Sequence, residues 1–193
     1  MNGRALQPLK PIAEVLIEGE LSPFEHEALH RLLKRGFTVE PPSYTPFAYG
    51  EEDLATRINI TFHYPYNQDF FTRHLRENWR ELKDLIKEVR YRRGRAGAAF
   101  TFTFVQDEFR LVFKSGNEVD HDQISSAMDQ IGHLTGIVSR MLKAETLPET
   151  IGIVECRFDK LTDRWDEFRA TNTAESNVYE FDEESSNWRP TNV

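Results

Sequence analysis

The sequence contains little cysteine and no long apolar run. Cys156 is the single cysteine among 193 residues, so an intrachain disulfide is excluded, and its place in an apolar stretch indicates a packed thiol. A reducing, cytoplasmic setting is therefore predicted. No stretch approaches the roughly 20 apolar residues that a membrane helix needs. Lys10, Pro11 and Glu14 interrupt the start of the chain before a signal-type apolar core could form, so neither membrane insertion nor secretion is expected.

An excess of positive charge is also missing. The formal net charge is -8 at pH 7, from 24 Lys and Arg against 32 Asp and Glu. This charge repels polyanions at long range, so non-specific nucleic-acid binding would need a strong local basic patch. Hydrophobic residues make up 39% of the chain, which suits one well-cored domain with additions or two small domains. We favour one domain with extensions.

Residues 57–159 form the most informative part of the sequence. Alternating apolar positions predict strands and a 3.6-residue apolar period predicts helices, in the order strand, helix, strand, strand, helix, strand. This order is typical of the split βαβ arrangement, so we predict an α+β fold, a ferredoxin-like βαββαβ two-layer sandwich. Such folds serve binding modules, subunits and enzymes alike, so the fold alone predicts no function. The predicted elements are strands at 57–64, 98–105, 109–115 and 151–158, and helices from Asn67 or Asp69 to Gly94 and at 120–143.

The two central strands are predicted to form a hairpin. A tight turn at 107–108 would place Phe104 opposite Leu111 and Phe102 opposite Phe113. Both apolar sets then fall on the helix-covered face, as the period of two requires.

Residues 1–50 are predicted to form an N-terminal arm. A short apolar run at 12–18 predicts a strand, and Ser22 and Glu25 form a capping box that predicts the start of a helix over 23–35. Three prolines at 41–46 exclude a helix or a central strand there, so this stretch is predicted to be a surface strap.

Residues 160–193 are predicted to be either a β-hairpin extension or an acidic tail. A weak repeat relates residues 158–165 to 181–188, because each copy has a Phe, a turn-forming Asp and a Trp. Asp can bond to the backbone that follows it, and the two aromatic rings can meet across a hairpin. The alternative is a disordered tail, because this end of the chain is acidic and has few aliphatic residues.

The most specific motif is His26-Glu27-Ala28-Leu29-His30 on the first predicted helix. Two His residues one helical turn apart can hold Zn²⁺ while the intervening Glu activates a metal-bound water. Glu25 and Arg31, however, flank the motif with charges, and both His residues lie at the edge of the apolar arc of the helix. We therefore interpret the motif as surface helix, and keep a small zinc metallohydrolase using His26, His30 and Glu27 as an alternative.

A basic cluster lies at the end of the second predicted helix. Cations are favoured at a helix C-terminus by the macrodipole, which explains the cluster without a ligand. The alternative is nucleic-acid or anion binding, with Tyr91 as a stacking surface. The cluster consists of Lys87, Arg90, Arg92, Arg93 and Arg95.

A stripe of small residues follows the outer side of the third predicted helix. Two glycines inside a helix cost about 1 kcal/mol each relative to Ala, which suggests that something approaches closely there. The candidates are a partner protein, an intrachain cover, or simple tolerance. The stripe consists of Ser125, Asp129, Gly132, Gly136 and Ser139.

Taken together, these patterns predict a non-catalytic protein-interaction module with no cofactor. It would act as a homo-oligomer or as a subunit of a larger assembly, because contact surfaces are present and no convincing catalytic constellation is. The zinc metallohydrolase and the nucleic-acid-binding protein remain the alternatives.

Overall fold

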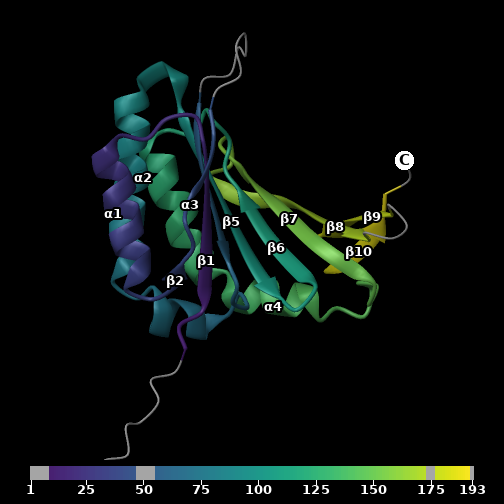
Figure 1. The fold of residues 1–193 in the computed structure, drawn as a ribbon. Coiled ribbons are helices and arrows are strands. Elements are labelled where there is room, and N and C mark those ends of the chain that lie inside the picture. Colours follow the sequence, from purple (N-terminus) through teal and green to yellow (C-terminus); the bar gives the residue numbers. More distant parts are fainter. Residues whose placement is uncertain (1–8, 47–54, 173–176, 192–193) are drawn as a thin grey trace, which may run out of the picture.

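The computed structural model describes residues 9–46, 55–172 and 177–191 of the chain. Residues 1–8 and 47–50 of the predicted arm, and 173–176 and 192–193 of the predicted C-terminal segment, lie outside the described residues. The fold is mixed α+β, with ten strands in one sheet and helices α1, α2 and α3 on one face of it (Figure 1). The strands are β1 (Ile12–Glu18), β2 (Thr38–Val39), β3 (Ser43–Thr45), β4 (Thr56–Phe62), β5 (Ala98–Gln106), β6 (Phe109–Lys114), β7 (Ile151–Asp159), β8 (Arg164–Asn172), β9 (Val178–Asp182) and β10 (Asn187–Pro190). The helices are α1 (Pro23–Lys34), η1 (Phe70–His74), α2 (Asn78–Arg93), η2 (Gly94–Ala96), α3 (His121–His133) and α4 (Thr135–Leu142).

The strand order of the sheet does not confirm the ferredoxin-like prediction. The order is β10-β9-β8-β7-β6-β5-β4-β1-β2, with β3 also pairing with β1. In a split βαβ unit a third strand separates the two strands that a helix connects. Here β4 lies directly beside β5 and β6 directly beside β7, both pairs parallel, so each helix makes a simple crossover between neighbours. The element order and the pairing of β5 with β6 are as predicted, whereas the strands that each helix connects lie side by side.

The N-terminal segment joins this same sheet. Strand β1 has the predicted bounds and pairs antiparallel with β4, and α1 ends one residue before the predicted end. The capping box is present: the Ser22 hydroxyl accepts from the Glu25 amide at 3.2 Å, and the Glu25 carboxylate accepts from the Ser22 amide at 2.7 Å. The predicted strap contains β3, which pairs parallel with β1. The division of the chain at residues 50, 57 and 159 stays a prediction.

The predicted helix from Asn67 or Asp69 to Gly94 is interrupted in the structure. A π-helical turn, η1, comes first, and α2 begins only at Asn78. Leu75 turns fully into the core here, and its amide bonds to the Phe70 carbonyl five residues back. The backbone of His74 also presses on Gly36, where a Cβ would stand 2.1 Å from the His74 carbonyl oxygen. Packing against a distant segment therefore breaks the helix.

The predicted helix 120–143 is likewise divided, at Leu134, into α3 and α4. The Tyr66 hydroxyl donates to the Ile131 carbonyl, the group that would accept from Thr135 in an unbroken helix. A side chain from another segment thus enters the hydrogen-bond ladder, and Gly132 and Gly136 stand on either side of the break.

An aromatic core fills the space between the sheet and the helices. Phe62, Phe70 and Phe104 are almost fully buried and lie within 4.9 to 5.5 Å of one another by ring centroid. The register of the central hairpin is as predicted, with Phe104 opposite Leu111 and Phe102 opposite Phe113. The opposite face of the sheet carries polar pairs, among them Asn59 with Glu18 at 3.0 Å.

The C-terminal segment forms hairpins, which is one of the two predicted alternatives. Phe158 pairs with Trp165 across β7 and β8, and Phe181 pairs with Trp188 across β9 and β10. The ring centroids are 5.5 and 5.3 Å apart, so the aromatics meet in both copies of the repeat. Each Trp then donates its indole N–H to a helix carbonyl: Trp165 to Ala127 and Trp188 to Met141, both at 2.9 Å. The hairpins are thereby fixed to α3 and α4.

The turns of both hairpins use the same Asp chemistry. The Asp159 carboxylate accepts from the Leu161 amide at 2.9 Å, and the Asp182 carboxylate accepts from the Glu184 amide at 3.1 Å. Hydrogen bonds from the backbone of Leu161 and the hydroxyl of Thr162 lower the pKa of Asp159 below its ordinary value. The repeat in the sequence is therefore a repeated turn in the structure.

In the described part of the chain, no helix has the length and apolar character required to span a membrane.

Candidate functional site

The HExxH motif lies on α1, at the outer surface of the molecule. Nδ1 of His26 is 2.8 Å from the Tyr44 hydroxyl, and the two rings meet edge to face. Burial lowers the pKa of His26, while the nearby Glu25 carboxylate opposes this shift. Glu27 is exposed and pairs with Arg31 at 3.7 Å. Within the described ranges, no group of three or more His, Cys, Asp and Glu residues is placed to hold a metal ion, so His26 and His30 have no third ligand there.

The basic cluster at the end of α2 is largely occupied by contacts within the fold. Arg92 donates to both carboxylate oxygens of Glu25, at 2.7 and 2.5 Å, and Arg93 lies 3.3 Å from Glu20. Arg90 donates to the carbonyls of Val119 and Gly94. The side chain of Glu25 is only 3% exposed, so this ion pair satisfies a buried charge. Lys87 and Arg95 show no such contact in the described part of the chain.

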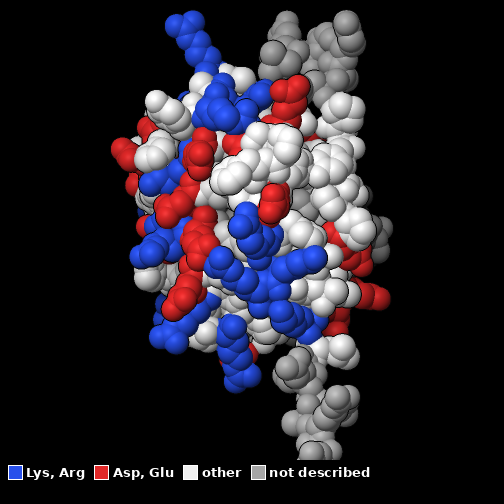
Figure 2. Space-filling model, turned by 60° about the vertical axis from the view of Figure 1, so that its left-hand side comes forward, with Lys and Arg blue, Asp and Glu red and all other residues white. Residues whose placement is uncertain are grey.

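A second group of cations lies at the C-terminal end of α1. Figure 2 shows Lys and Arg side chains gathered in the lower half of the view. Arg35 donates to Glu81 at 2.6 Å, and Lys10 donates to the Lys34 carbonyl at 2.8 Å. Arg31 pairs with Glu27. The cations at 31–35 are those of an ordinary helix C-terminus, and Lys10 joins them only in the folded chain. Like the cluster on α2, it consists mostly of cations that are paired inside the molecule.

The small-residue stripe is divided between two environments. Asp129 accepts from Lys83 of α2 at 2.7 Å, so this end of the stripe lies against a neighbouring helix. Gly132 and Gly136 are different, because no described atom outside their own helix lies within 4 Å of where a Cβ would stand. The described residues therefore provide no cover over the two glycines. Ser125 and Ser139 are half-buried.

A groove of about 700 Å³ lies between the α3–α4 segment, strands β8 and β9, and the turn that follows β9. We call it the aromatic groove. Trp165 and Phe168 form its floor and are nearly buried, whereas Ile137 on its rim is 48% exposed. Its volume is in the range of ordinary ligand pockets. The lining residues are Gln130, Leu134, Ile137, Arg140, Met141, Arg164, Trp165, Phe168, Phe181, Glu183 and Ser186.

The charges of the aromatic groove are not balanced. Arg164 donates to Glu183 at 3.2 Å and lies 3.6 Å from Asp166. The guanidinium group of Arg140, exposed on α4, forms no hydrogen bond or ion pair within the described ranges. The groove thus combines an aromatic floor with one uncommitted guanidinium group.

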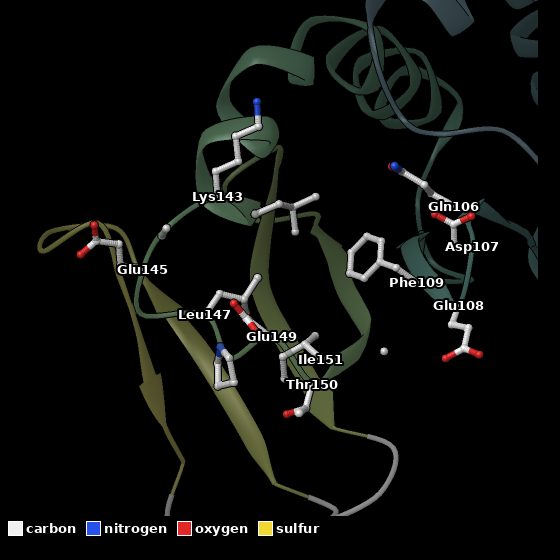
Figure 3. A pocket seen from close by; sticks show the side chains of 14 residues that line it. Gln106, Asp107, Glu108, Phe109, Lys143, Glu145, Leu147, Glu149, Thr150 and Ile151 are labelled. Carbon is white, nitrogen blue, oxygen red and sulfur yellow. The ribbon is translucent and has the colours of Figure 1, made fainter.

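A second hollow, of about 910 Å³, lies between the β5–β6 turn and the loop from α4 to β7. Figure 3 shows the ring of Phe109 extending into it, with Leu147 and Ile151 across the opening and the ammonium group of Lys143 directed away. Its rim carries the carboxylates of Asp107, Glu108, Glu145 and Glu149. These carboxylates are exposed and stand apart from one another, so they form an acidic rim rather than a coordinated ligand set.

The sequence pattern indicates the two glycines but not the aromatic groove. The sequence places Trp165 and Phe181 only within possible hairpins. The available signal was the aromatic repeat, whose second copy brings Phe181 over α4. Ile137 and Arg140, three residues apart on an exposed helix face, gave no signal by themselves.

Comparisons of the chain with known protein families, with curated proteins and with solved structures gave no match.

Proposed function

We propose that this protein is a non-catalytic interaction module that binds a segment of another protein chain in the aromatic groove. The observation that carries the proposal is the exposure of Ile137 above a floor of Trp165 and Phe168. Aromatic side chains and arginine in a concave site are typical of the positions that dominate binding energy in protein interfaces.

The neighbouring glycines support the same surface. Gly136 lies four residues before Arg140 of the groove, so the two share one side of α4, and no described atom lies within 4 Å of a Cβ at Gly132 or Gly136. Glycine in a helix allows a partner backbone to approach closely, at a cost to the helix of about 1 kcal/mol relative to Ala. A partner that lies over α4 would use both features, the glycine face and the groove.

A site-specific crosslink tests this proposal. The photoreactive residue p-benzoylphenylalanine is placed at Ile137, and in a control protein at Leu161, which is 87% exposed and lies outside the groove. Illumination in extract of the source cells should give a discrete adduct from position 137 and none from position 161. Mass spectrometry of the adduct separates a homo-oligomer, in which the captured peptide comes from this chain, from a subunit of a mixed assembly. Equal adducts from both positions, or no adduct from position 137, would overturn the proposal.

The zinc metallohydrolase and the nucleic-acid-binding protein receive less support. The HExxH motif has two His residues and no described third ligand, and three of the five cations at the end of α2 are held by contacts inside the fold. A catalytic site binds near one zinc per chain, so metal analysis of chelator-free protein tests the first. Titration with single-stranded and duplex nucleic acid at low salt tests the second.

A further inference from the structure

We infer that the segment bound by the aromatic groove is amphipathic and acidic, with an apolar side chain on the groove floor and a carboxylate against Arg140. This inference rests on the proposed function, because it specifies the chemistry of the partner at the same site.

One of the two arginines in the groove has no counter-ion within the described residues. Of the two arginines that line the groove, Arg164 is already engaged by Glu183 and Asp166. Arg140 has no counter-ion within the described ranges. A guanidinium group presents a planar fork of donors that matches a carboxylate, and such charge-assisted pairs are stronger than neutral hydrogen bonds.

Arg140 lies close to the exposed Ile137 on α4. It lies three residues after Ile137 on the same helix, so the two side chains are neighbours on one face of α4. A segment that packs an apolar residue on Ile137 therefore brings its neighbouring positions within reach of the guanidinium. Binding would exclude water from this pair and strengthen it relative to an exposed ion pair.

Cationic segments and wholly apolar segments match the charges of the groove less well. A cationic segment would meet Arg140 and Arg164 without an uncommitted carboxylate, since Glu183 already accepts from Arg164. A wholly apolar segment would leave Arg140 partly desolvated and unpaired, which costs binding energy. Charge complementarity thus favours an acidic and apolar occupant over both.

Selection from a random dodecapeptide display library tests the inference with full-length protein as bait. Wild type is compared with Ile137→Ala, which removes the apolar contact at the rim, with Arg140→Glu, and with the control Lys143→Glu. Lys143 is an exposed cation three residues beyond Arg140 that lines the other hollow and not the groove. Wild type should enrich peptides with a large apolar residue and an Asp or Glu at a fixed spacing, and Lys143→Glu should enrich the same peptides.

The decisive result is a reversal of charge preference. Arg140→Glu should enrich Lys or Arg at the position where wild type enriches Asp or Glu, and wild-type peptides should bind it about 10-fold more weakly. Apolar peptides that need Ile137 but show no charge preference would overturn the inference and leave the proposed function standing. If no peptide depends on Ile137, the proposed function fails and the inference with it. Binding of the anionic dye 8-anilinonaphthalene-1-sulfonate that depends on Arg140, with no peptide selected, would show that the groove takes a small apolar acid instead.

Discussion

The α1–α2 helix pair and the α3–α4 face differ in how completely the fold uses their side chains. In the α1–α2 pair, Arg92 is bound by Glu25 and Arg35 by Glu81, and Gly36 receives the backbone of His74. On the α3–α4 face, Gly132 and Gly136 have open space above them and Arg140 lacks a described counter-ion. The conspicuous sequence motifs, HExxH and the basic cluster, lie on the α1–α2 pair, where three of the five cations of the cluster already have partners. The difference suggests that the surface with unused contacts is the better candidate for binding.

The largest effect is expected from filling the close approach in the α1–α2 region. Gly36→Ala would place its Cβ 2.1 Å from the His74 carbonyl oxygen, so the backbone of one segment must move. Overpacking of this kind costs about 3 kcal/mol. Urea unfolding, followed by circular dichroism, measures the loss. A loss below about 0.5 kcal/mol would show that this region is as open as the α3–α4 face.

The next effect is expected from breaking the ion pair between the helices. Arg92→Ala leaves the buried Glu25 carboxylate without its partner, and should lower the free energy of unfolding by about 2 kcal/mol, since solvent reaches Arg92 and reduces the full cost. Arg95→Ala, at an exposed cation of the same cluster, is the control and should stay within about 0.5 kcal/mol. If the two variants lose equal stability, Arg92 is no more committed to the fold than Arg95.

The same pair predicts a pH dependence. Burial raises the pKa of Glu25, but hydrogen bonds from Arg92 and Ser22 outweigh this and leave the pKa below its ordinary value. A lowered folded-state pKa gives stability that is present above the unfolded-state pKa, near 4.3, and lost as the pH falls through the folded-state pKa. The stability difference between wild type and Glu25→Gln should therefore be constant above about pH 5.5 and shrink below about pH 4. A difference that does not change down to pH 3 would contradict the shift.

The sequence predicted the elements that are determined locally. The bounds of β1, the capping box at Ser22 and the register at Phe104 depend on residues close in sequence, and all are found. The repeated Asp turns, one of the two alternatives for the C-terminal segment, are found as well. The breaks at Leu75 and Leu134 were missed, because they require the approach of Gly36 and the Tyr66 hydroxyl from distant segments. Apart from the β5–β6 hairpin, the strand neighbours were missed for the same reason, since βαββαβ periodicity does not specify which strands pair.

The candidate site was predictable only in part. Gly132 and Gly136 attracted attention because glycine is unfavourable within a helix. The walls of the aromatic groove come from residues 130–141, 164–168 and 181–186, which only the folded sheet brings together. No local pattern in any of the three segments indicates a groove, because the groove exists only where the three segments meet.

A smaller effect, of opposite sign, is expected at the open glycines. Gly132→Ala and Gly136→Ala meet no described neighbour, and each should stabilise the isolated protein by about 0.5 to 1 kcal/mol because Ala is the better helix former. The same variants should weaken the adduct formed from position 137 if a partner lies against the glycines. Thermal unfolding and the crosslinking assay, done on the same proteins, separate the two roles. Destabilisation by either variant would show that the face is covered within the chain.

The smallest effect on stability is expected at Arg140, and it is the sharpest contrast with Arg92. Arg140→Gln removes a charge that no described group pairs with, so the free energy of unfolding should change by less than about 0.5 kcal/mol. The hydrogen bond from the Trp188 indole to the Met141 carbonyl next to it should remain, and with it the near-ultraviolet circular dichroism of the tryptophans. A loss comparable to that of Arg92→Ala would mean that Arg140 serves the fold, and the groove would then lose its reason to prefer an acidic partner.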